Sequence, residues 1–281
     1  MGCADKDCCS SGSKTGSISF PDTFDHATPW KFYNHLIGGI PEDILVTDCC
    51  LGSHWCYVEA ECGMGVSFAT SGGARRNFTQ NLTGLSLRAV AELSKSWNFP
   101  EASIGVAALN AWYSRPALVD PLGATYDEPV EMPDGTIRKI DAFQLYYPQL
   151  ADKRVTIIGH FPHVERVGEI AHLTVLERNC SSALDTPDPA CEYIIPSQDF
   201  VFITGVTIIN KTLPRLLDLA KNATVIMVGP SVIPSPFLFD WGVEMLAGSV
   251  VADPEKTKVA VKLGAGQLFG EALQMMSITK S

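Results

Sequence analysis

The residues best suited to chemistry stand directly after short apolar segments in the second half of the sequence. The segment VTII, at 155–158, runs into Gly159 and His160, and the segment LTVL, at 173–176, runs into Glu177. Imidazole and carboxylate groups transfer protons in enzymes and also bind polar ligands. His160 and Glu177 are therefore the candidate catalytic residues.

These two belong to a larger set of residues that lie at or just after the carboxyl ends of predicted strands. In a parallel sheet such positions share one edge, where ligands bind. Asn110 joins the set because an amide inside an apolar helical segment needs partners, and it either caps a loop or points into a site. The predicted ligand-binding residues are Asn110, Gly159, His160, Phe161, Glu177, Thr204, Gly205, Asn210, Thr212, Gly229, Pro230 and Ser231.

A nucleotide is one alternative ligand. Glu177 lies 18 positions after Gly159, close to the spacing at which an acidic residue accepts ribose hydroxyls. The G-x-G-x-x-G fingerprint is absent, however, and His160 and Phe161 occupy the space that phosphate-binding glycines would leave open. A nucleotide- or S-adenosylmethionine-dependent enzyme therefore stays an alternative. Thr212 also has a second interpretation, as the cap of a helix with Pro214 in its first turn.

A metal is another alternative. His160 and His163 are three positions apart, but no third ligand stands at a standard spacing. Cys49 and Cys50 would face opposite sides of one strand. The N-terminal cysteines match no zinc spacing either; they are Cys3, Cys8 and Cys9. The cofactor is undetermined, with a heavy or transition metal as the candidate, and a non-catalytic heavy-metal-binding protein that uses Cys and His remains open.

The elements that position these residues fall into two regions after a flexible, cysteine-containing tail at 1–27. Residues 28–150 mix helices (29–40, 83–97 and from 101) with strands between 42 and 70, and form the first predicted domain. Pro and Gly turns between 115 and 150 indicate a linker or an elaborated connection. In 151–281, strands of four to six residues alternate with helices, which predicts a parallel sheet with helices on both faces.

Composition limits the partners. The net charge is −10 and no Lys/Arg run occurs, which argues against nucleic acid. The longest apolar run, 200–210, is too short to cross a bilayer, and the N-terminus has no apolar core of a signal peptide. We expect a cytoplasmic protein with a small-molecule ligand and no membrane partner, and the sequence is compatible with a homodimer. Arg75 and Arg76 form either a solvated turn or a contact for an anionic ligand.

Several long strings resemble a bacterial and archaeal family labelled "putative heavy-metal chelation domain". They are GIPEDILVTDCCLGSHW (39–55), TQNLTGLSLRAVAELSKSWNFPEASIGVAALNAWYS (79–114), GHFPHVE (159–165), ITGVTIINKTLPRLLDLAKNA (203–223), VGPSVIPSPFLF (228–239) and WGVEMLAG (241–248). The resemblance covers about 37–264. It implies an α+β domain like the N-terminal domain of enolase, a following Rossmann-like domain and a pocket between them.

The same resemblance places six residues of the second domain in that pocket, with Asn110 and a turn at 63–67 from the first. The six are Gly159, His160, Glu177, Thr204, Asn210 and Gly229. The family has no established activity. Our leading hypothesis is a small-molecule-binding protein that acts as an enzyme, by condensation or hydrolysis, on a metal-chelating or pterin-like metabolite.

Overall fold

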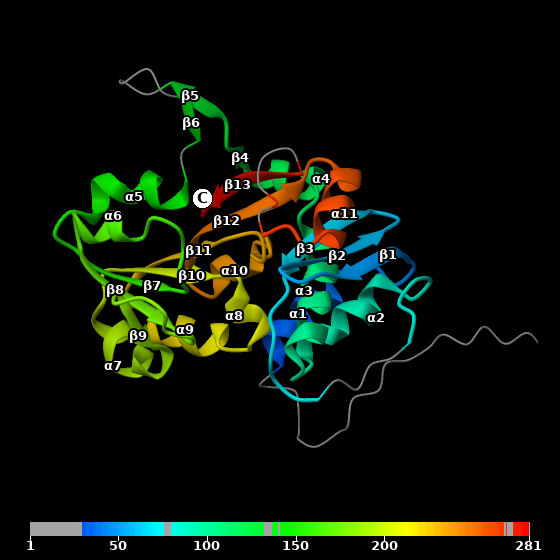
Figure 1. The fold of residues 1–281 in the computed structure, drawn as a ribbon, viewed down its shortest axis with the longest axis horizontal. Helices are drawn as coiled ribbons and strands as arrows, with labels where there is room; N and C mark the ends of the chain where they lie inside the picture. The colour runs from blue at the N-terminus through cyan, green and yellow to red at the C-terminus, as the bar shows by residue number, and fades with distance from the viewer. Residues whose placement is uncertain are drawn as a thin grey trace, which may run out of the picture.

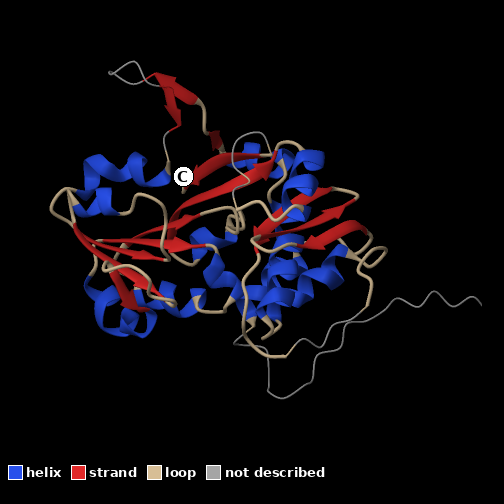
Figure 2. Cartoon of the chain, viewed as in Figure 1, coloured by secondary structure: helices blue, strands red, loops and turns tan. Residues whose placement is uncertain are grey.

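A computed structural model describes residues 30–75, 80–131, 137–139, 141–266, 268 and 272–280. Two sheets dominate it, one of three antiparallel strands and one of eight mostly parallel strands. Figures 1 and 2 show the small sheet at the right and the large sheet at the left, with helices packed around both. The predicted mixed α/β class is therefore confirmed. The predicted tail at 1–27 lies outside the described residues.

The first region follows the sequence-based expectations closely. Its elements are α1 (Lys31–Gly38), β1 (Val46–Leu51), β2 (Trp55–Ala60), β3 (Gly63–Phe68), α2 (Leu87–Ala91), η1 (Glu92–Lys95) and α3 (Phe99–Tyr113). The helix predicted at 83–97 is shorter and continues as a 3₁₀ turn. The turn expected at 63–67 is wrong, because these residues form β3. Met64 and Val66 are buried on one face of that strand, while Gly65 lies against α3 on the other.

The described residues between 115 and 150 form more helices and strands than the Pro and Gly content of this stretch predicts. It forms α4 (Pro116–Val119), η2 (Asp120–Leu122), β4 (Thr125–Tyr126), β5 (Pro129–Glu131), β6 (Ile137–Lys139) and α5 (Ala142–Leu150). Asp141 and Gln144 make a capping box that starts α5, which accommodates Pro148 near its end. Strands β5 and β6 form a ribbon that projects from the body (Figure 1).

The large sheet has the strand order β4-β13-β12-β11-β10-β7-β8-β9. Its remaining strands are β7 (Arg154–Ile158), β8 (His172–Glu177), β9 (Asp185–Pro187), β10 (Phe200–Thr204), β11 (Thr224–Val228), β12 (Val243–Val251) and β13 (Leu273–Thr279). The six from β12 to β9 are parallel, and β13 and β4 are antiparallel. Chain order runs outward in both directions from the contact between β7 and β10. This reversal is the topological switch point at which open α/β sheets bind ligands.

Helices cover both faces of the large sheet. On one face α5 and α6 (Glu165–Gly168) pack through Phe143 and Val167 on strand residues such as Ile157. On the other lie α7 (Cys191–Ile194), α8 (Val206–Ile209), α9 (Leu213–Leu219) and α10 (Phe237–Asp240). This burial on both faces explains why the central strands β10 and β11 are apolar along most of their length, as the sequence pattern predicted.

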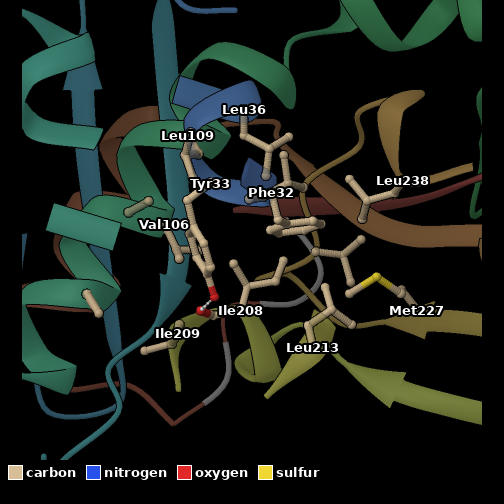
Figure 3. Close-up of a cluster of buried hydrophobic side chains, with 14 of the residues drawn as sticks. Phe32, Tyr33, Leu36, Val106, Leu109, Ile208, Ile209, Leu213, Met227 and Leu238 are labelled. Atoms are coloured by element: carbon tan, nitrogen blue, oxygen red, sulfur yellow. Dashed lines mark hydrogen bonds between the residues drawn. The ribbon is translucent and has the colours of Figure 1, made fainter. Parts of the chain in front are cut away.

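One hydrophobic core joins the two regions. Phe32 and Tyr33 of α1 and Leu109 of α3 pack with Ile208 and Met227 from the large-sheet region (Figure 3). The buried Tyr33 hydroxyl donates a hydrogen bond to the carbonyl oxygen of Ile208 at 2.7 Å. From the second region, α11 (Pro254–Lys262) packs on the outer face of the small sheet. The shared core fixes the geometry of the two regions relative to each other.

Candidate active site at the carboxyl ends of the strands

A cavity of about 1760 Å³ lies at the switch point. Eleven of the twelve sequence-predicted residues line it; they are Gly159, His160, Phe161, Glu177, Thr204, Gly205, Asn210, Thr212, Gly229, Pro230 and Ser231. The structure therefore brings together residues from the ends of β7, β8, β10 and β11. Asn110 is the exception, since it is buried behind the cavity wall.

The ends of β7 and β11 are shaped by two glycines in left-handed conformations. Gly159 has a φ of +96° and Gly229 a φ of +106°, values that residues with a Cβ rarely adopt. The ring of Phe161 lies across both. A Cβ added to Gly159 would be 3.7 Å from its Cε2, and one added to Gly229 would be 3.9 Å from its Cε1. An aromatic ring thus lies over the turn where a dinucleotide would place its phosphates.

Glu177 is fully engaged by the backbone. One carboxylate oxygen accepts a hydrogen bond from the His160 N–H at 3.1 Å, and the other accepts from the N–H groups of Arg178 and Asn179 at 2.7 and 3.0 Å. Three charge-assisted bonds of this kind hold a side chain firmly. Glu177 therefore ties the loop after β7 to the loop after β8.

His160 is paired with a carboxylate that the sequence did not point to. Its Nδ1 lies 2.8 Å from Oδ1 of Asp185. The backbone N–H groups of Ser181 and Ser182 both donate to Oδ2 of Asp185 at 2.8 Å, and these bonds, with a smaller contribution from the His160 ring, hold the pKa of Asp185 below its ordinary value. The Asp185 side chain exposes no surface, although Asp185 begins β9, the edge strand of the large sheet.

The charge on Asp185 fixes the imidazole tautomer. An ionised carboxylate only accepts hydrogen bonds, so Nδ1 of His160 is the donor and carries hydrogen. Nε2 is then the acceptor nitrogen of the neutral ring. The His160 side chain is 40% exposed and lines the cavity, so the ring is accessible to a ligand. The pair has the geometry of a histidine base oriented by a carboxylate.

Asn210 and Thr212 form a second polar unit. Oδ1 of Asn210 accepts hydrogen bonds from the Thr212 N–H at 3.1 Å and from the Thr212 hydroxyl at 2.6 Å. Thr212 precedes α9, but its side chain makes no capping bond, so the capping interpretation is wrong. The hydroxyl is used to orient the Asn210 amide instead. Pro214 lies in the first turn of the helix as predicted.

Two contacts from the first region support the loop after β11. Nδ2 of Asn110 donates to the carbonyl oxygens of Val66 and Pro230 at 2.9 and 3.1 Å. The Phe68 N–H donates to the hydroxyl of Ser231 at 2.8 Å. Asn110 thus satisfies its amide by holding a cavity-lining loop rather than by lining the cavity itself.

Sequence reasoning missed the aromatic part of the cavity wall. Trp55, Phe68 and Phe99 line it from the first region, and Phe143 from α5. Phe143 also meets Phe161 edge to face at 5.3 Å. The missed signal was helical spacing in 142–150, obscured by Pro148. Asp185 was missed because its strand has three residues and lies in a polar loop. Arg75 is described but does not line the cavity, and Arg76 lies outside the described residues.

The donors for a metal do not gather in the part of the chain that the structure describes. No group of three or more His, Cys, Asp or Glu side chains there is arranged to hold an ion. Cys49 packs on the main core while Cys50 packs on the α11 side, as their alternation predicts. Cys56 is buried with its Sγ 3.1 Å from the Ser67 hydroxyl. These residues do not fit a resident metal. None of the described helices is long and apolar enough to cross a membrane.

Comparison with known proteins places this chain in a family. Residues 141–276 match the family model DUF364, and residues 33–113 match the model DUF4213; both are described as "putative heavy-metal chelation". A DUF364 protein of unknown function from Desulfitobacterium hafniense DCB-2 is 36% identical, with a TM-score of 0.79 over 89% of this chain and 98% of that one. The chain belongs to the DUF364 family. The resemblance inferred from the sequence is thereby confirmed.

Two further relatives are less similar in sequence. A DUF364 protein of unknown function from Pyrococcus horikoshii is 26% identical, with a TM-score of 0.71 over 90% of this chain and 98% of that one. An uncharacterized protein of Methanocaldococcus jannaschii, MJ0500, is 26% identical over 251 residues, which are 84% of this chain and 90% of the relative.

Proposed function

We propose that this DUF364 protein is an enzyme that binds a metal-chelating or pterin-like metabolite in the cavity and catalyses its condensation or hydrolysis. The observation that carries the proposal is the His160–Asp185 pair at 2.8 Å, beside the switch point of the sheet. Acid–base catalysis needs a proton acceptor held in one tautomer, and a buried carboxylate on the far ring nitrogen supplies that.

In hydrolysis, Nε2 of His160 takes a proton from the attacking water and then donates it to the leaving group. Asp185 stabilises the imidazolium that exists between these two transfers. The Asn210 amide, oriented by Thr212, binds a polar group of the ligand. Phe161 offers an apolar ring surface for a flat ligand beside these groups. The described residues supply no resident metal site, so no step is assigned to one.

The test combines a binding panel with a turnover assay, in which pterins and metal-chelating metabolites are incubated with the protein and followed by mass spectrometry. His160→Gln should lower turnover by about 10²–10⁴-fold. It should change affinity much less. Asn210→Ala should weaken binding. His172→Gln is the matched control, because His172 is exposed at the start of β8 and does not line the cavity. Unchanged affinity and turnover in both His160→Gln and Asn210→Ala would remove this cavity as the site.

A further inference from the structure

The cavity is poor in usable positive charge. Among the described residues that line it, three are lysine or arginine, two are histidine and six are acidic. The acidic ones are Asp127, Glu128, Asp141, Glu177, Asp188 and Glu192. A ligand that enters the cavity therefore meets a negative surface on a protein whose net charge is already −10. Such a field attracts cations and repels anions over roughly a Debye length.

Each of the three lysine and arginine side chains is already paired with a neighbouring carboxylate. Lys139 lies 3.0 Å from Asp127, and the Nε of Arg178 lies 2.8 Å from Asp188. Arg215 binds Glu192 through two nitrogens, at 2.9 and 2.5 Å. A two-point arginine–carboxylate pair is the geometry in which an arginine would bind an anionic ligand. Here the protein's own carboxylates occupy those positions.

Backbone donors in the loops after β7 and β8 are occupied in the same way. In nucleotide-binding α/β proteins such N–H groups bind phosphate. In this protein the N–H groups of His160, Arg178 and Asn179 donate to Glu177, and those of Ser181 and Ser182 donate to Asp185. Two internal carboxylates thus take backbone donors that these two loops would otherwise offer to an anionic ligand.

Several of the groups that remain for recognition in the cavity are neutral or aromatic. Among them are the Asn210 amide, Nε2 of His160 and the rings of Phe161, Phe68 and Phe99. Phe68 is 38% exposed and lines the cavity, so its ring is accessible to a ligand there. Aromatic faces bind flat rings and attract cations.

From these observations we infer that the cavity selects an uncharged or positively charged planar heterocycle and rejects anionic ligands. The inference rests on the proposed function and narrows it, since it separates pterin-like rings from carboxylate-rich chelators.

The experiment uses three probes on one scaffold: pterin, 6-aminomethylpterin and pterin-6-carboxylate. Dissociation constants are measured by calorimetry with the full chain at 20 and 300 mM NaCl. The carboxylate should bind about tenfold or more weakly than the aminomethyl compound, because like charges are brought together. The difference in affinity between these two compounds should be smaller at 300 mM NaCl. The variant Asp188→Asn releases Arg178, so it should also reduce this difference in affinity. The control is Asp218→Asn, which leaves the Arg215–Glu192 pair in place and should not change the difference.

The outcomes separate the two proposals. If the carboxylate binds most tightly, the charge inference is overturned and the cavity remains a heterocycle site. If no probe binds to a protein that circular dichroism shows to be folded, the heterocycle class is overturned, and with it the pterin-like part of the proposed function. If the protein turns over a metal-chelating metabolite but binds none of the probes, the proposed enzymatic activity is supported and the heterocycle inference is overturned.

Discussion

Nδ2 of Asn110 lies 3.1 Å from the carbonyl oxygen of Pro230, which is 120 positions further along the chain. The same amide reaches Val66 on β3, so one buried side chain joins the small sheet, α3 and a loop of the large sheet. This amide determines where the loop after β11 stands relative to the aromatic residues of the first region.

Replacing Asn110 with alanine should lower the free energy of unfolding by about 1–3 kcal/mol, because two buried carbonyl groups lose their donor. Urea denaturation measures the change. The control is Ser114→Ala, which removes only the hydroxyl that donates to Oδ1 of Asn110 at 3.2 Å. If the two variants were equally stable, the amide would not be what holds the Pro230 loop.

Two helical glycines should respond in opposite directions to alanine. A Cβ at Gly105 in α3 would lie 1.9 Å from the backbone nitrogen of Ser94, whereas nothing lies within 4 Å of a Cβ at Gly38 in α1. Gly105→Ala should destabilise the protein by about 1–3 kcal/mol or more, since α3 must move away from η1. Gly38→Ala should stabilise it by about 0.4–1 kcal/mol. Thermal unfolding of both variants checks the prediction, and a stabilised Gly105→Ala would contradict the close packing of α3.

Lys211 should make stability depend on pH. Its Nζ donates to the carbonyl oxygens of Ser96 and Ile209, and burial lowers its pKa from 10.5 to about 7. Below pH 7 both folded and unfolded chains hold this proton. Between about 7 and 10.5 the unfolded chain holds more, so the contribution of Lys211 to stability rises with pH.

The measurement is the difference in unfolding free energy between the wild type and Lys211→Met from pH 6 to 10. This difference cancels the titration of the cysteines, which both proteins share. It should increase in favour of the wild type as the pH rises. Lys221→Met, at an exposed position, is the control. A difference that stays flat with pH would mean that the Lys211 ammonium is not penalised by burial.

Glu177→Gln should loosen two loops without unfolding the protein. Glutamine offers one acceptor oxygen where the carboxylate offers two, so at least one of the three backbone N–H groups loses a charge-assisted bond. Hydrogen exchange should quicken at His160, Arg178 and Asn179. Glu165→Gln, an exposed change on α6, should leave those amides unaltered. Unchanged exchange in Glu177→Gln would free Glu177 for the catalytic role that the sequence suggested.

The sequence predicted the large sheet well because its strands are buried on both faces. Short apolar runs that alternate with helices predict buried strands of a parallel sheet, as at Val155–Ile158 and Phe200–Ile203. Position at the carboxyl end of a strand was enough to bring eleven of the predicted residues to one cavity. That inference needs only the direction of the strands.

Long-range pairing was beyond such reasoning. Strand β4 has two residues and is a strand because it pairs with β13, which follows it by about 150 positions. Asp185 is paired with His160 through a short strand in a polar loop, and neither residue carries a local signal for the other. Thr212 illustrates the same limit, since its spacing allows a cap but its actual partner is Asn210.

The large sheet is completed late in synthesis, because β13 lies between β4 and β12 in the sheet but follows both in the chain. β4 leaves the ribosome long before β13, and until β13 follows, β12 has a free backbone edge. A nascent chain with an open edge of this kind is exposed to pairing with other chains. One edge of β12 is therefore covered late, when β13 pairs with it.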